Sequence, residues 1–173
     1  MKKIVLSITG FLFISAVLIS CGPTSDNASK YNDALVSWQT KVFQKESVLI
    51  EAFSKNMPDK LDISYEELVK QLKESSDSVQ KIKTFAGKTD LKDAAMKVFE
   101  AYKDVTENDY PEMIKLAKTP DSLYTQETDD KVIEISKKID DKLDKVIDAF
   151  VEKQEKFSEK YKFELKAEEN EKK

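Results

Sequence analysis

Apolar residues recur every three or four positions over most of the chain after residue 30, with polar residues between them. This spacing is typical of amphipathic helices, and no stretch alternates convincingly with the two-residue period of a half-buried strand. Glycine and proline, which interrupt helices, are scarce in the same region. The pattern therefore predicts an all-α protein with four helices.

The first two helices have recognisable ends. The first is predicted to end near Asn56, because Pro58 disfavours helical geometry at the residue before it. The second is predicted to begin at Ser64, since Ser64 and Glu67 have the spacing of a capping box. Gly87 is a natural left-handed terminator for this second helix.

The fourth helix is predicted to be longer than the third. The third begins after Asp90 and continues through Pro111, where we expect a kink. The fourth runs from Gln126 to about Lys162 and, at about 1.5 Å per residue, would reach roughly 55 Å. Four helices with short connections pack most simply as an antiparallel up-down-up-down bundle with a long fourth helix.

The N-terminal segment differs in composition from the rest of the chain. A basic start is followed by a mostly apolar run from Ile4 to Leu18, which is too short for an ordinary membrane span and indicates an export signal. The run ends in Leu18-Ile19-Ser20-Cys21, which contains the only cysteine of the chain. A thiolate is a soft nucleophile, and the small Ser20 leaves room for a peptidase at the next bond.

These residues resemble the signal peptide of bacterial lipoproteins. The resemblance implies that the Cys21 thiol receives a diacylglyceryl group, that the chain is cut just before it, and that an N-acyl chain completes the anchor. Two or more acyl chains hold a protein stably on a membrane. The alternatives are an ordinary secretory signal with a chance free cysteine and an uncleaved signal anchor.

The resulting domain organisation has four parts. Residues 1–20 form the cleaved signal helix, 21–29 the lipidated cysteine and a flexible tether, 30–163 the four-helix bundle, and 164–173 a charged, disordered tail. Residues 22 and 23 are Gly and Pro rather than the Asp that favours inner-membrane retention in some bacteria. We therefore expect a cell-envelope protein on the outer membrane or the cell surface.

Composition narrows the functions that the chain can perform. The formal net charge of −4 becomes −6 when Lys2 and Lys3 leave with the signal, which argues against a nucleic-acid partner. The chain has no histidine and no arginine, so imidazole bases, Glu-x-x-His di-iron ligands and guanidinium phosphate forks are absent. We expect no enzyme, no metal and no cofactor beyond the lipid on Cys21.

A polar layer inside the bundle is one candidate site. Lys45 occupies a heptad position that is aromatic at Tyr31 and Trp38, and an antiparallel first pair of helices would place Lys45 level with Ser76 and near Tyr102. Such a layer would fix the helix register or bind a small anion. The alternative is that Lys45 lies at the edge of the stripe and extends into water.

The far end of the fourth helix is the second candidate. Phe157, Tyr161 and Phe163 would form an exposed apolar interaction surface there if this helix protrudes beyond its partners. The alternative is that they pack on a neighbouring helix or in a dimer seam.

The bundle region also resembles helical surface lipoproteins that begin with a Tyr-Asn-Asp motif soon after the lipidated cysteine, as Tyr31-Asn32-Asp33 does here. This resemblance implies the same fold and location and no activity. We expect a lipid-anchored envelope protein that acts by contact with an unknown protein partner, in an oligomeric state that the sequence leaves open. The alternative is a carrier that holds a small apolar or anionic ligand between the helices.

Overall fold

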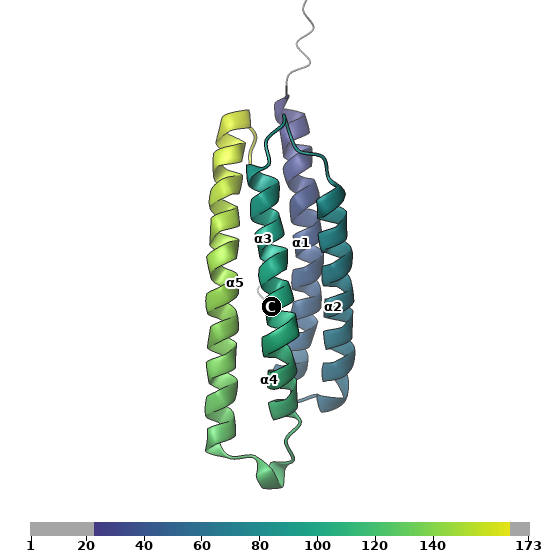
Figure 1. Cartoon of the computed structure of the whole chain (residues 1–173), viewed down its shortest axis with the longest axis vertical. Coiled ribbons are helices and arrows are strands. Elements are labelled where there is room, and N and C mark those ends of the chain that lie inside the picture. The colour runs from purple at the N-terminus through teal and green to yellow at the C-terminus, as the bar shows by residue number, and fades with distance from the viewer. Residues whose placement is uncertain (1–22, 167–173) are drawn as a thin grey trace, which may run out of the picture.

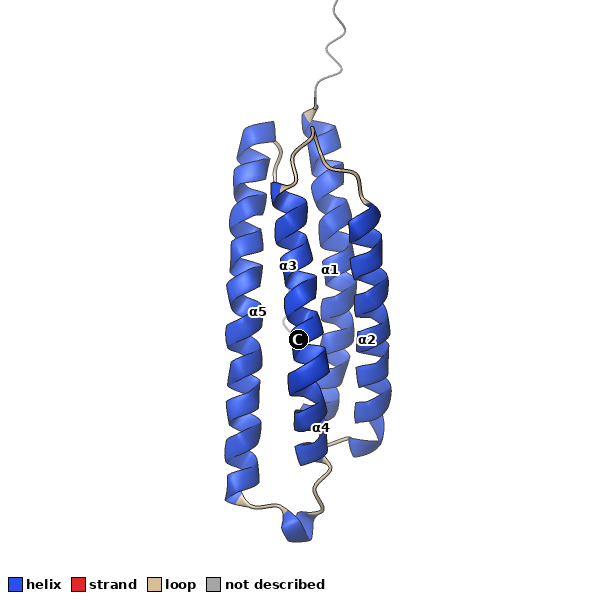
Figure 2. Ribbon diagram, in the orientation of Figure 1, coloured by secondary structure: helices blue, strands red, loops and turns tan. Residues whose placement is uncertain are grey.

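The computed structural model describes residues 23–166, and this part of the chain is helical with no β-strand (Figure 2). Four long helical columns pack side by side, which confirms the predicted all-α class. In Figure 1, α1 (Ser25–Ser54), α2 (Pro58–Lys81) and α5 (Gln126–Tyr161) each form one column, and the fourth contains α3 (Asp90–Asp104) and α4 (Tyr110–Ala117). The predicted signal peptide and Cys21 lie outside the described residues.

Helix α1 begins earlier than predicted. The Thr24 side chain accepts a hydrogen bond from the Asn27 backbone N–H at 3.2 Å, so Thr24 is the N-cap. Residues 25–29, which were expected to be tether, are therefore helical. The helix ends where Asn56 adopts a positive φ of 49° and the Met57 N–H bonds back to the Ala52 carbonyl, a Schellman-type closure.

The predicted start of α2 at Ser64 is wrong. The helix begins at Pro58. Proline is tolerated at the first helical position because the N–H that it lacks would have no intrahelical partner there. The earlier start buries Leu61 and places Ser64 inside the helix, also buried. Burial of Leu61 outweighs the local capping signal. The helix ends at Lys81, so the prediction that Gly87 terminates it is wrong; Gly87 adopts a left-handed φ of 70° in the loop that leads to α3.

The predicted continuous helix through Pro111 is confirmed, with a distortion next to the proline. Residues 90–117 are helical throughout, and a π-helical segment, η1 (Val105–Asp109), joins α3 to α4. The Tyr110 N–H bonds to the Val105 carbonyl, five residues back. Pro111 has no N–H to donate. The wider π-helical turn before it therefore costs no backbone hydrogen bond from this residue.

The fourth helix has the predicted boundaries. Thr125 and Thr128 form the cap at the start of α5, and Lys162 ends the helix with a left-handed φ of 57°. A short 3-10 turn, η2 (Asp121–Leu123), lies in the loop before α5. The core is contiguous through all four columns, and its largest fully buried side chains include Tyr102, Tyr110 and Phe99.

The far end of α5 does not protrude, which corrects the prediction. Phe157, Tyr161 and Phe163 are half-buried and join Tyr31 and Phe85 in a cluster with ring centroids 4.8 to 5.9 Å apart. The end of α5 lies beside the start of α1 (Figure 1).

The first residues of the predicted tail also return onto α1. Lys166 Nζ lies 2.5 Å from Asp33 Oδ2, and Ser25 Oγ donates to the Lys162 carbonyl at 2.7 Å. Residues 167–173, the rest of that prediction, lie outside the described residues.

Candidate functional site

A groove of about 400 Å³ runs between α2 and the α3–η1 column. Its floor contains Leu72 and Phe99, which are almost fully buried, and the more exposed Val69. Charged side chains border it on both sides. On α2 these are Lys73 and Asp77, and on α3 and η1 they are Glu100, Lys103 and Glu107.

The groove has an apolar centre and a rim of mixed charge. Lys103 and Glu107 face each other across 3.8 Å on one rim, and Lys73 and Asp77 have no ion pair among residues 23–166. An apolar floor gives binding energy through burial, and charged rims select orientation. The groove can therefore accept an amphipathic chain segment or a small ligand with both polar and apolar parts.

The π-helical segment forms one end of this groove. Thr106 and Glu107 of η1 line it, and the Tyr65 hydroxyl on α2 donates to the Thr106 carbonyl at 2.8 Å. This bond crosses from α2 to the distorted turn and satisfies a carbonyl there. π-Helical turns are often found at functional sites, because they change the direction of side chains within a helix.

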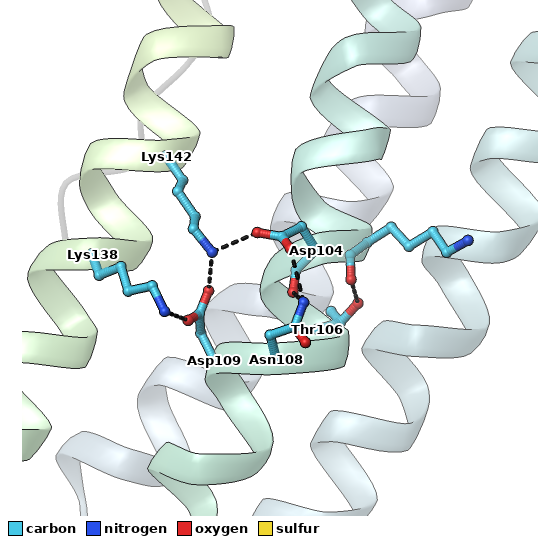
Figure 3. A network of polar contacts seen from close by, with 7 residues as sticks. Asp104, Thr106, Asn108, Asp109, Lys138 and Lys142 are labelled. Atoms are coloured by element: carbon cyan, nitrogen blue, oxygen red, sulfur yellow. Dashed lines mark hydrogen bonds and ion pairs between the residues drawn. The ribbon is translucent and has the colours of Figure 1, made fainter.

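On the opposite side, η1 is tied to α5 by an ion network (Figure 3). The Asp109 carboxylate is 2% exposed and forms two ion pairs. Its Oδ1 lies 2.7 Å from Lys138 Nζ, and its Oδ2 lies 2.6 Å from Lys142 Nζ. Lys142 also contacts Asp104 at 2.5 Å, and its hydrogen bond holds the pKa of Asp104 below the usual range. The same two carboxylates raise the pKa of Lys142.

A third polar contact joins α3 and α4, on either side of η1, to α1. The hydroxyls of Tyr102 and Tyr110 both donate to the Glu46 carboxylate, the second at 2.6 Å. Both tyrosines are almost completely buried. Burial raises the pKa of Glu46 above its usual range, and the two hydrogen bonds oppose that shift. Glu46 is therefore the polar centre on this side of the bundle.

The predicted layer of Lys45, Ser76 and Tyr102 does not exist. Lys45 pairs with Glu67 at 2.7 Å and keeps 38% of its side chain exposed, as the alternative prediction for this residue states. The register differs because α2 begins at Pro58, which brings Glu67 level with Lys45 in place of Ser76. Ser76 lines the groove, and Tyr102 bonds to Glu46.

Sequence reasoning missed the polar residues of the α1 core, although a signal was present. Asn32, Gln39 and Glu46 are spaced seven residues apart, which keeps them on one side of the helix. Asn32 and Gln39 are buried, and Gln154 on α5 donates to Asn32 at 3.0 Å. Seven-residue steps that start from Asn32 identify this row. The prediction used the steps that start from Tyr31 and lead to Lys45.

Two further properties concern ligands and membranes. Within residues 23–166, no group of three or more Cys, Asp or Glu side chains is placed to hold a metal ion. No helix in the same range has the length and apolar character needed to cross a bilayer. Cys21, the predicted lipidation site, lies outside that range.

Comparison of the chain with models of known protein families, with curated proteins and with solved structures found no significant match.

Proposed function

We propose that this chain is a lipid-anchored protein of the bacterial cell envelope that binds a protein partner and catalyses no reaction. The anchor would be Cys21, and the support for it is the Leu18-Ile19-Ser20-Cys21 sequence at the end of a short apolar run. An outer-membrane or surface location is part of the proposal. The lack of histidine and arginine in the whole chain supports a non-catalytic role.

We further propose that the columns follow the antiparallel up-down-up-down order. The three-residue connection between α1 and α2 and the short loop between α4 and α5 support this order, because short connections join neighbouring antiparallel helices.

The observation that carries the binding function is the groove between α2 and α3. Its floor is formed by apolar side chains of the neighbouring α2 and α3 columns, and both rims carry acids and lysines. A partner segment that fits has one apolar face and charges of both signs beside it, as an amphipathic helix has. Rim pairs would set orientation more than affinity, since exposed ion pairs contribute only about 0 to 1 kcal/mol each.

The second candidate is a carrier for a small amphiphilic ligand. The groove volume of about 400 Å³ lies within the range of small-molecule sites, and this favours the alternative. Of the predicted layer of Lys45, Ser76 and Tyr102, only Ser76 lines this groove.

Amine cross-linking in intact cells tests partner binding, with a matched pair of variants. Val69 and Ile63 are exposed β-branched residues of α2, but only Val69 lines the groove. We expect Val69→Glu to lose a reproducible cross-linked protein and Ile63→Glu to retain it. Retention of the partner by both variants would contradict the groove as its binding site. An extractable small molecule lost only in Val69→Glu would support the carrier.

The anchor is tested separately. Cells supplied with an alkyne-labelled palmitate should label the natural chain, and Cys21→Ser should lose the label. A labelled Cys21→Ser variant would overturn the proposed anchor site.

A further inference from the structure

A second pocket lies at the end of the bundle where α1 begins and α5 ends. It has a volume of about 160 Å³ and lies beside the aromatic cluster. Tyr31 and Phe157 contribute aromatic walls, and Leu91 of α3 contributes an aliphatic one. This pocket is separate from the α2–α3 groove, with which it shares no lining residue.

Positive charge dominates this pocket. Four lysines and one acid line it: Lys88, Lys153, Lys156, Lys160 and Asp90. Lys156 is paired with Glu152, and Lys160 lies 5.2 Å from the centre of the Tyr161 ring. Lys88 and Lys153 have no ion pair among the described residues. Two ammonium groups are thus available for an anion in a concave, partly apolar site.

Hydrogen-bond donors are present in the same place. The Tyr31 hydroxyl is buried and donates no hydrogen bond within residues 23–166. Burial raises the pKa of this phenol, and a hydrogen bond with the Phe85 backbone opposes that shift. The pocket also contains Asp90 and Leu91, the first two residues of α3, and the Thr89 side chain does not cap that helix. Backbone N–H groups in a first helical turn have no intrahelical partners and favour anions.

We propose that this pocket binds a phosphate group through Lys88, Lys153 and the Tyr31 hydroxyl. Its small volume suits one phosphate rather than an extended ligand. Asp90 weakens binding by repulsion, so this proposal predicts that neutralising Asp90 tightens it. The phosphate could belong to an anionic lipid head group or to a soluble phosphate compound.

The position of the pocket favours the lipid source, and this part rests on the proposed anchor. Only two residues separate Cys21 from the Thr24 cap, and these three residue steps span at most about 10 Å in an extended chain. A chain acylated at Cys21 would hold this end of the bundle at the membrane surface, within reach of head groups. The helical start at Ser25 makes this approach closer than a nine-residue tether would.

The direct test uses the full acylated chain in phosphatidylcholine nanodiscs, with ¹³C-dimethylated lysines observed by NMR. Dimethylation keeps the positive charge. Titration with inorganic phosphate should give saturable shifts at Lys88 and Lys153. The double variant Lys88→Gln/Lys153→Gln should bind phosphate about tenfold more weakly or worse, because it loses charge-assisted hydrogen bonds. Asp90→Asn should bind more tightly.

The matched control is Lys60→Gln/Lys115→Gln, which removes two exposed lysines from α2 and α4 with the same change in net charge. Its phosphate affinity should equal that of the natural chain. Equal weakening in both double variants, or a linear shift reproduced by chloride at the same ionic strength, would overturn the site.

Nanodiscs containing phosphatidylglycerol separate the two sources. Shifts at Lys88 and Lys153 without added phosphate support the lipid head group, whereas shifts only with inorganic phosphate support a soluble compound. No shift with either overturns the proposal. Intact mass of the same sample reports acylation of Cys21, so an unacylated chain that still binds phosphate contradicts the anchor and retains the pocket.

Discussion

Two rows of side chains on α1 have the same seven-residue spacing and opposite chemistry. The apolar row is completely buried and consists of Ala28, Leu35, Val42 and Leu49. The polar row consists of Asn32, Gln39 and Glu46. The apolar row needs only to be covered. The polar row needs specific partners, which come from α3, α4 and α5, and so it constrains how those helices align with α1.

The three residues of the polar row differ in whether their side chains have hydrogen-bond partners. Asn32 and Glu46 have hydrogen-bond partners, but the Gln39 side-chain amide nitrogen is buried without one among the described residues. A buried donor without a partner costs free energy, whereas a satisfied one stabilises slightly. The three residues should therefore respond differently to apolar replacement, and this contrast can be tested.

The largest expected effect is in the apolar row. Leu35→Ala should lower the free energy of unfolding by about 3 kcal/mol, because it removes a fully buried side chain and leaves a cavity. Urea denaturation followed by circular dichroism measures this value. Val48→Ala, on the same helix and 47% exposed, is the control and should change stability by less than about 0.5 kcal/mol. Similar losses in both variants would mean that this row is not the main apolar contact of α1.

Replacement of the polar centre should have the next largest effect. Glu46→Leu should lower the free energy of unfolding by about 2 kcal/mol, because the Tyr102 and Tyr110 hydroxyls lose their acceptor while remaining buried. The triple variant with Tyr102→Phe and Tyr110→Phe should recover part of this loss in the same assay. A triple variant less stable than Glu46→Leu alone would contradict this explanation.

Gln39→Leu is expected to act in the opposite direction. It removes a buried amide nitrogen that has no partner within residues 23–166 and should raise the free energy of unfolding by about 1 kcal/mol. Thermal unfolding compares it with Asn32→Leu, which should destabilise the protein by removing the acceptor of Gln154. A destabilised Gln39→Leu variant would show that Gln39 has a partner in solution.

The smallest expected effect is the pH dependence of Glu46. Burial raises its folded pKa above the unfolded value near 4.5, so the folded state binds this proton more tightly than the unfolded state does. The contribution of Glu46 to stability therefore falls as pH rises from the unfolded pKa through the folded pKa. Denaturation of natural protein and Glu46→Gln at several pH values isolates this change. A contribution that grows with pH would show that the tyrosine hydrogen bonds outweigh burial.

Patterns local to one helix predicted the fold class well. The apolar spacing of α5 and the residues Gln126 to Lys162 agree with the structure because that helix is amphipathic along its whole length. The same reasoning failed at α2, where two local start signals competed. Pro58 prevailed over the Ser64 capping box because a start at Pro58 buries Leu61, a gain that depends on the other helices.

The candidate sites were less predictable, since they depend on register. Starting α2 at Pro58 brings Glu67 rather than Ser76 to Lys45, and this one change removed the predicted polar layer. The aromatic residues near the end of α5 were predicted to be exposed, but Phe85 from the loop before α3 packs against Phe157 and Tyr161. Neither contact can be inferred from spacing within a single helix.

The sequence by itself determined that the chain forms amphipathic helices, because side-chain spacing sets which face of a helix is apolar. It also determined the lack of histidine and arginine chemistry. The tertiary structure alone decided that Glu46 meets Tyr102 and Tyr110, that Ser76 lines a groove, and that lysines from a loop and α5 converge beside Tyr31. The physical reason is that such contacts depend on where each helix starts and how it aligns with its neighbours. That alignment minimises the free energy of the whole core rather than of any one segment.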